Sequence, residues 1–104
     1  MNQNKKKCME YFFIYILKCS DQSYYIGHTD SIEKRISEHN QGLTPCYTSS
    51  RLPVECVFIQ TFTSRIEAIE AEHKIKKWSR KKKEALINQD WNEISRLAKK
   101  NFKS

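Results

Sequence analysis

The segment from residue 11 to residue 19 constrains the fold most, because large apolar side chains occupy both sets of alternating positions. Phe12, Ile14 and Ile16 stand on one parity, and Phe13, Tyr15 and Leu17 stand on the other. This pattern is typical of a strand that is covered on both faces. We therefore expect a layered fold in which other elements pack on each side of this strand.

The residues from 20 to 23 are turn formers, and residues 24–29 predict a return strand. The length of the turn decides whether Tyr15 and Tyr25 share a face, because opposed residues of an antiparallel pair project to the same side. A two-residue loop of Asp21 and Gln22 would place the tyrosines on opposite faces. A three-residue loop centred on Asp21 would place them on one face, so a function that uses both phenols requires an odd loop or a bulge.

Three segments begin with a helix-capping pattern, in which Ser or Asp is followed by Glu three residues later. They predict helices over about 31–40, over 64–78 and from 90 onward, and Ser79 predicts a short helix up to Ile87. Residues 54–62 are rich in β-branched and aromatic types and predict a third strand. The order β-β-α-β-α-α-α indicates an α+β fold, with a small antiparallel three-stranded sheet flanked by helices.

At 104 residues the chain is long enough for one domain with one core. We expect a flexible basic segment at 1–10, a globular domain at 11–88 and a C-terminal helical extension at 89–104. No apolar run approaches the roughly 20 residues that span a bilayer, so we expect no membrane attachment. The four cysteines form no Cys-x-x-Cys pair, which favours reduced thiols, no structural metal and a cytoplasmic location.

The formal net charge is +7, and its distribution is uneven. Seven of the ten residues from 74 to 83 are basic and none is acidic: Lys74, Lys76, Lys77, Arg80, Lys81, Lys82 and Lys83. A solvated helix face is the ordinary explanation of such a run. The absence of compensating charge and the tryptophan within it favour a polyanion, and we predict that these seven residues bind nucleic acid.

Two features of the predicted helices are unexpected for residues that only pack. Glu72 falls in the same helical sector as the apolar Ala68 and Ile75, and a carboxylate facing a core is costly unless it is paired or binds a cation. A salt bridge, a metal ligand and a general acid or base remain alternatives. Arg35 and His39 are four residues apart and share a face, either as a solvated pair or as groups that grip a phosphate.

Either tyrosine could act as a base only with help. A free phenol has a pKa near 10, so its activation at neutral pH requires roughly 3–4 kcal/mol from nearby cations. Arg35, a protonated His28 and a metal ion held by Glu72 are the available sources. Together these groups favour a site that cleaves phosphodiesters.

In these residues the chain resembles the GIY-YIG nuclease superfamily, in particular its small single-domain bacterial branch. Residues 25–27 (Tyr-Ile-Gly) match the second half of the signature, and residues 13–15 (Phe-Ile-Tyr) stand at the first half, with phenylalanine in place of glycine. Arg35, His39 and Glu72 match the spacing of the next motifs. The resemblance covers about residues 11–87.

The resemblance implies hydrolysis of DNA with one divalent ion, Mg²⁺ or Mn²⁺, held by Glu72. Tyr25 would be the general base and Tyr15 would orient water on the metal. Arg35 would stabilise charge on the phosphate, and His39 would assist at the same phosphate. Two accessory candidates follow from the same resemblance: His28, directly after the signature glycine, and Asn88, the nearest match to the final asparagine motif.

We expect the cleavage to be guided by DNA structure rather than by sequence, as in repair or recombination, with RNA not excluded and with a protein partner as one source of targeting. The first alternative is a nucleic-acid-binding module of the same fold without turnover. The second is an interaction protein in which Glu72 pairs with a lysine or arginine and no open cleft lies beside it. The sequence does not define the oligomeric state.

Overall fold

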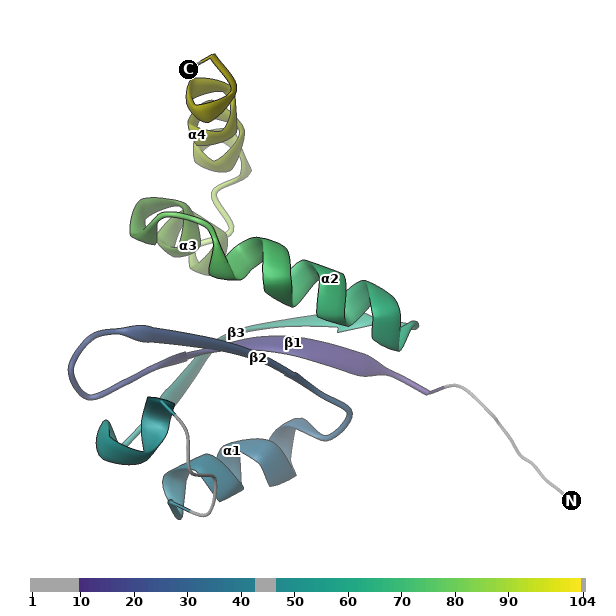
Figure 1. The fold of residues 1–104 in the computed structure, drawn as a ribbon, viewed down its shortest axis with the longest axis vertical. Helices are drawn as coiled ribbons and strands as arrows, with labels where there is room; N and C mark the ends of the chain where they lie inside the picture. The colour runs from purple at the N-terminus through teal and green to yellow at the C-terminus, as the bar shows by residue number, and fades with distance from the viewer. Residues whose placement is uncertain (1–9, 43–46, 104) are drawn as a thin grey trace, which may run out of the picture.

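The computed structural model describes residues 10–42 and 47–103 and confirms the predicted α+β fold and element order (Figure 1). Of the predicted N-terminal segment 1–10, only Glu10 lies within the described residues. The elements are β1 (Phe12–Lys18), β2 (Tyr24–Thr29), α1 (Ile32–Asn40), the 3-10 helix η2 (Tyr47–Ser50), β3 (Glu55–Phe62), α2 (Arg65–Lys76), α3 (Arg80–Ile87) and α4 (Trp91–Lys103). The short helix η2 lies between the predicted first helix and the predicted third strand, where the sequence analysis places no regular element.

The sheet is antiparallel with strand order β2-β1-β3, so β1 is central and β2 is an edge strand. The β1–β2 register pairs Tyr15 with Gly27 and Leu17 with Tyr25. The turn between the strands is centred on Asp21, and φ at the following residue is +74°. The loop is therefore odd, which meets the geometric condition for Tyr15 and Tyr25 to share a face.

Helices cover both faces of the sheet, with α1 on one side and α2 on the other (Figure 1). The face towards α1 buries Tyr15, Leu17, Cys19 and Val54, and the face towards α2 buries Phe12, Ile14, Ile16 and Ile26 together with Ala68, Ile75 and Leu86. Each fully buried side chain of this kind stabilises the fold by about 1.5–3 kcal/mol. The prediction that the first strand is covered on both faces is confirmed.

Side-chain caps fix the start of three helices. Ser64, Ser79 and Asp90 each accept a hydrogen bond from the backbone amide three residues ahead, at 3.3, 3.2 and 3.1 Å. The capping box predicted for α1 is wrong, because the N-cap residue Ser31 makes no side-chain capping bond. The hydroxyl of Thr29 instead accepts a hydrogen bond from the backbone amide of Ser31 at 3.1 Å and shapes the entry into the helix.

The last helix, α4, packs on α3 and projects away from the sheet (Figure 1). Within residues 10–42 and 47–103, no helix combines the length and the apolar character needed to cross a bilayer. The candidate catalytic residues Tyr15, Tyr25, Arg35, His39 and Glu72 lie on β1, β2, α1 and α2.

Candidate active site

The two signature tyrosines lie side by side on the face of the sheet that α1 covers. Tyr15, on the central strand, is only 1% exposed, whereas Tyr25 on the edge strand is half-buried. The centroids of the two rings are 6.4 Å apart. The half-buried phenol of Tyr25 thus lies next to the fully enclosed phenol of Tyr15.

Arg35 connects α1 to this pair. The interaction of its guanidinium with the Tyr15 phenol raises the pKa of Arg35. Burial raises the pKa of Tyr15 to about 12, although Arg35 opposes the shift. At neutral pH the ionised fraction of Tyr15 is then on the order of one in 10⁵. Tyr15 is therefore a neutral phenol at pH 7.

His39 is completely buried next to the same phenol. Its Nε2 lies 3.2 Å from the Tyr15 oxygen, and its Nδ1 lies 2.7 Å from the Thr48 hydroxyl. Burial and the charge of Arg35 lower the pKa of His39, so the ring is neutral at pH 7.

This location excludes one of the two alternatives for His39. It is not part of a solvated Arg–His face, because its side chain is fully buried and both ring nitrogens have protein partners. Its assistance at a phosphate stays a prediction. Sequence spacing shows that Arg35 and His39 share one side of a helix, but not how deeply the last turn of that helix is covered. The link between His39 and the rest of the site is through Tyr15.

Glu72 projects from α2 on the opposite side of the sheet and is buried, as its helical position predicts. His28 Nδ1 forms a short hydrogen bond with Oε1, and Lys76 Nζ lies 2.7 Å from Oε2. Burial raises the pKa of Glu72, but Lys76 and His28 together outweigh it, so the pKa lies below its usual value. The carboxylate is ionised and both of its oxygens are engaged.

The donor set of this site fits one hard cation with a single protein carboxylate. Within the described ranges no group of three His, Cys, Asp or Glu side chains is positioned to hold a metal. Mg²⁺ is commonly bound by one or two carboxylates, with water and substrate phosphate oxygens as the other ligands. The Lys76 side chain is 47% exposed, so it can swing away from Glu72 and leave Oε2 to an ion.

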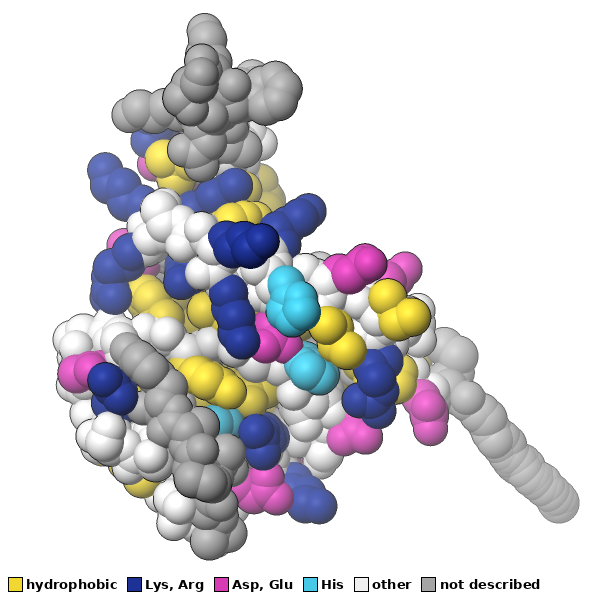
Figure 2. Space-filling view, in the orientation of Figure 1, with side chains coloured by type: hydrophobic (Ala, Val, Ile, Leu, Met, Phe, Trp, Pro, Cys, Tyr) yellow, Lys and Arg dark blue, Asp and Glu magenta, His cyan; other side chains and the backbone are white. Residues whose placement is uncertain are grey.

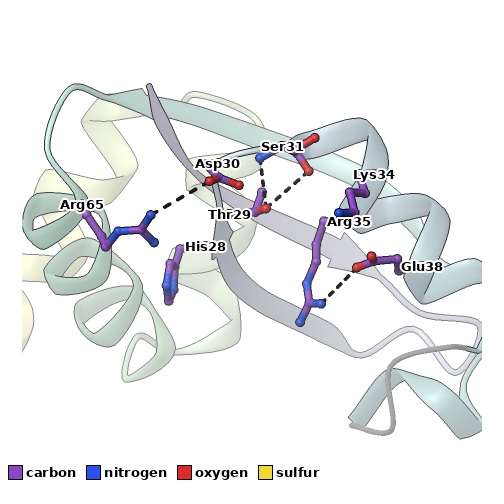
Figure 3. Close-up of a pocket in the computed structure, with 8 residues that line it drawn as sticks. All are labelled: His28, Thr29, Asp30, Ser31, Lys34, Arg35, Glu38 and Arg65. Carbon is purple, nitrogen blue, oxygen red and sulfur yellow. Dashed lines mark hydrogen bonds and ion pairs between the residues drawn. The ribbon is translucent and has the colours of Figure 1, made fainter. Parts of the chain in front are cut away.

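A cleft of about 290 Å³ lies beside these residues (Figure 3). Its lining comes from the end of β2, from α1 and from the start of α2, and consists of His28, Thr29, Asp30, Ser31, Lys34, Arg35, Glu38 and Arg65. Arg35 Nη1 lies 3.3 Å from Glu38 Oε1, and Arg65 Nη2 lies 4.0 Å from Asp30 Oδ2. Arg35 and His28 both line this cleft, whereas Tyr15, Tyr25 and Glu72 are not among its lining residues.

The residues of the predicted basic run differ in how exposed they are. Figure 2 shows Lys and Arg side chains gathered over the end of α2 and over α3. Lys82 is nevertheless buried, with its ammonium 4.2 Å from the centre of the Trp78 ring. Its contact with nucleic acid stays a prediction. Arg80 pairs with Glu84 and lies over the ring of Tyr24. Lys74, Lys76, Lys77 and Lys81 are exposed, and Lys83 is half-buried.

Asn88 is not among the residues that line the cleft. It is the exposed C-cap residue of α3, and in the described part of the chain its side chain makes no hydrogen bond with the tyrosines, Arg35 or Glu72. His28, by contrast, lies in the cleft and contacts Glu72 directly.

Sequence reasoning missed Lys34, Thr48 and Arg65. Lys34 precedes Arg35 and Arg65 opens α2, so helix positions could have suggested the two cations. Thr48 had no comparable signal, because it lies in an irregular stretch without periodicity.

Comparison with known proteins agrees with this geometry. The family model described as the GIY-YIG catalytic domain matches residues 11–85. The UPF0213 protein YazA of Bacillus subtilis is 44% identical over 80 residues, which are 77% of this chain and 81% of that protein. A UPF0213 protein of Haloquadratum walsbyi is 41% identical over 80 residues, covering 77% of this chain and 90% of that protein.

A solved structure shares the fold at comparable similarity. The solution NMR structure of a protein from E. faecalis has a TM-score of 0.55 and 36% identity, and the match covers 77% of this chain and 85% of that chain. The relatives' UPF0213 names specify no substrate, whereas the domain description suggests nuclease activity. Because the family match spans most of the sequence and includes Tyr15, Tyr25, Arg35, His39 and Glu72, the chain belongs to the family of GIY-YIG catalytic domains.

Proposed function

We propose that the protein is a divalent-metal-dependent endonuclease that hydrolyses DNA phosphodiester bonds. The observation that supports this most is the cleft at edge strand β2, which both Arg35 and His28 line. Arg35 interacts with Tyr15 behind the cleft, and His28 forms a hydrogen bond with the ionised carboxylate of Glu72. A cation donor in the cleft, with a phenol and a carboxylate as its neighbours, matches the needs of an attack on a phosphate.

The two phenols take different roles in this proposal. Tyr15 keeps its proton because its pKa is about 12, and it holds the Arg35 guanidinium in place. Tyr25 is more exposed and interacts electrostatically with the same guanidinium, whose charge stabilises a Tyr25 phenolate as its proton leaves. We therefore assign Tyr25 as the base that takes the proton of the attacking water.

Arg35 then faces the phosphate. Its planar fork has five N–H donors, so it can hold Tyr15 and Glu38 and still donate to phosphate oxygens. A Mg²⁺ or Mn²⁺ ion held by Glu72 would offset charge on the phosphate and on the leaving oxygen. His28 keeps Glu72 oriented towards the cleft through its short hydrogen bond.

The proposed substrate is a DNA backbone recognised by shape. Lys34 and Arg65 line the cleft, and Lys77 and Lys81 are exposed at α2 and α3. Contacts from such side chains to phosphates position a strand without reading its sequence. Branched, nicked or flapped DNA of repair or recombination is therefore the substrate class we propose, with a protein partner as an additional source of targeting.

The engagement of Glu72 favours a second candidate, a binding module of the same fold without turnover. Lys76 and His28 occupy both carboxylate oxygens, which is the pairing that a purely structural role for Glu72 also produces. The adjacent cleft with Arg35 and Lys34 distinguishes a nucleic-acid-binding module from a general interaction protein.

A cleavage assay separates these functions. Branched, nicked and single-stranded DNAs and matched RNAs are incubated with the protein in Mg²⁺, in Mn²⁺ and in chelator. Tyr25→Phe and Glu72→Gln should each lower cleavage by about 10²–10⁴-fold with unchanged circular dichroism. The matched controls are Tyr24→Phe on the same strand and Glu70→Gln, which is exposed on the same helix.

Three outcomes of this assay distinguish the nuclease from the binding module and test the assigned residues. Metal-dependent cutting that both active-site variants lose supports the proposal. Salt-dependent DNA binding without cutting in any metal supports the binding module instead. Equal cutting by Tyr25→Phe, Glu72→Gln and their controls would show that the assigned residues do not carry the reaction.

A further inference from the structure

Thr48 is a buried polar residue to which the nuclease motifs give no role. It lies in η2, is 0% exposed, and its hydroxyl oxygen is 2.7 Å from His39 Nδ1. A buried hydroxyl and a buried imidazole are each costly unless they are hydrogen-bonded. The pair therefore satisfies two groups that would otherwise destabilise the core behind the tyrosines.

The position of η2 depends on the hairpin that carries the tyrosines. The Arg51 amide donates to the Thr48 carbonyl at 2.9 Å, and the Arg51 carbonyl accepts from the Ser20 amide at 3.0 Å. Arg51 Nε also donates to Asp21 Oδ2 at 3.0 Å, inside the β1–β2 turn. These contacts fix Thr48 relative to the same turn that sets the faces of Tyr15 and Tyr25.

The charge of Arg35 favours one direction for the donors and acceptors along this path. Arg35 can only donate and it interacts with the Tyr15 phenol, so the lone pairs of Tyr15 are best directed to this cation and the phenolic proton needs another acceptor. His39 Nε2 lies 3.2 Å away and serves as that acceptor. A neutral imidazole with an accepting Nε2 carries its proton on Nδ1, which then donates to the Thr48 hydroxyl.

We propose that Thr48 is a positioning residue of the active site. By accepting from Nδ1 it holds His39 in the tautomer that receives the Tyr15 proton, which leaves the lone pairs of Tyr15 directed to Arg35. Thr48 touches neither the phosphate nor the attacking water and acts through His39 and Tyr15. For its effect on catalysis, this inference rests on the proposed nuclease function.

Two substitutions separate the hydroxyl from the shape of the side chain. Thr48→Val keeps the branched shape but removes the acceptor, and Thr48→Ser keeps the hydroxyl. Long-range ¹H–¹⁵N NMR spectra of the full-length protein report which nitrogen of His39 is protonated, independently of activity. We expect Nδ1–H in the wild type and in Thr48→Ser, and a shift towards Nε2–H or a mixture in Thr48→Val.

Cleavage kinetics supply the second measurement. Thr48→Val should lower kcat by about tenfold with KM changed less than about twofold, because the substrate contacts stay while the orientation of Arg35 is lost. Thr48→Ser should stay within about threefold of the wild type in both constants.

Several results would overturn the proposal. These are Nε2–H in the wild type, a His39 tautomer unchanged in Thr48→Val, or equal losses in Thr48→Val and Thr48→Ser. The wild-type spectrum decides the tautomer even if Thr48→Val does not fold. If the wild type cuts no substrate, the nuclease proposal fails separately, while the spectra still test the Thr48–His39 link.

Discussion

Gly27 lies opposite Tyr15 in the β1–β2 pair, and the Tyr15 ring crosses the space where a side chain at Gly27 would begin. A β-carbon at Gly27 would lie 2.5 Å from the Tyr15 oxygen and 2.7 Å from its ring carbon Cζ. Both separations are far below van der Waals contact. The Tyr15 phenol, from the first half of the signature, therefore requires a glycine at position 27, in the second half.

Gly27→Ala should therefore displace the Tyr15 phenol. We expect a loss of about 1–3 kcal/mol in the free energy of unfolding, as for other overpacked sites, and a larger proportional loss of cleavage because Arg35 loses its partner. Thermal or urea unfolding measures the first effect. In a Tyr15→Leu background, which lacks both clashing atoms, the same substitution should cost clearly less, and an equal cost in both backgrounds would contradict the steric explanation.

Lys76 should compete with the metal for Glu72. Its ammonium occupies Oε2 at 2.7 Å, so Lys76→Met removes a cation that an incoming ion must displace. We expect the Mg²⁺ or Mn²⁺ concentration for half-maximal cleavage to fall several-fold, and Mn²⁺ binding measured by paramagnetic relaxation to tighten. Lys77→Met, at the C-cap of the same helix, is the matched control, and an identical metal dependence of the two variants would rule out the competition.

The buried phenol should be visible in an alkaline titration. The folded-state pKa of Tyr15 is about 12, above its ordinary value, so folding favours the neutral form. This contribution of about 2–3 kcal/mol is complete below pH 10 and is lost as the pH rises from 10 to 12. Phenolate absorbance should show a late step that Tyr15→Phe lacks, and the variant should lose less stability over this interval.

The carboxylate of Glu72 should give the opposite dependence at acid pH. Its folded-state pKa lies below the usual value, so its contribution to stability is present above about pH 4.5 and is lost as the pH falls through the folded-state pKa. Urea unfolding below pH 5 should therefore weaken the wild type more steeply than Glu72→Gln. Parallel pH profiles for the two proteins would show that the carboxylate gains nothing from Lys76 and His28.

Cleft and helix cations should contribute to DNA binding in different ways. Lys34→Ala and Arg65→Ala should weaken binding and reduce the salt slope by about one unit each, because each removes a proposed phosphate contact. Lys82→Met should leave DNA affinity unchanged, since its ammonium is packed over Trp78. Salt titrations of binding to one branched DNA measure all three, and a strong effect of Lys82→Met would show that the surface rearranges on binding.

The sequence predicted those parts of the molecule that depend on local pattern. The double-sided apolar strand, the caps of α2, α3 and α4 and the buried position of Glu72 are confirmed, because periodicity and capping chemistry act within a few residues. The sequence does not decide whether the hairpin loop has an odd or an even number of residues, since turn-forming residues fit both lengths. The register settles it in favour of the odd loop.

What the sequence could not supply depends on tertiary contacts. His39 is buried because η2 covers the last turn of α1, and the sequence of the helix does not indicate that another element packs there. The sequence does not distinguish Lys82 from the neighbouring basic residues. Only the structure shows that its ammonium lies over Trp78. The contact of Thr48 with His39 arises only in the folded chain, which brings residue 48 beside residue 39.

The centring of the hairpin turn on Asp21 also limits how relatives of this chain can vary. Deleting or inserting a single residue there would rotate every later side chain of β2 to the other side of the sheet, so Tyr25 would face α2 and the glycine would no longer lie beneath the Tyr15 ring. Changes of two residues preserve the arrangement. Active relatives should therefore gain or lose residues at this turn in even numbers, a counting rule that an alignment of sequences alone can check.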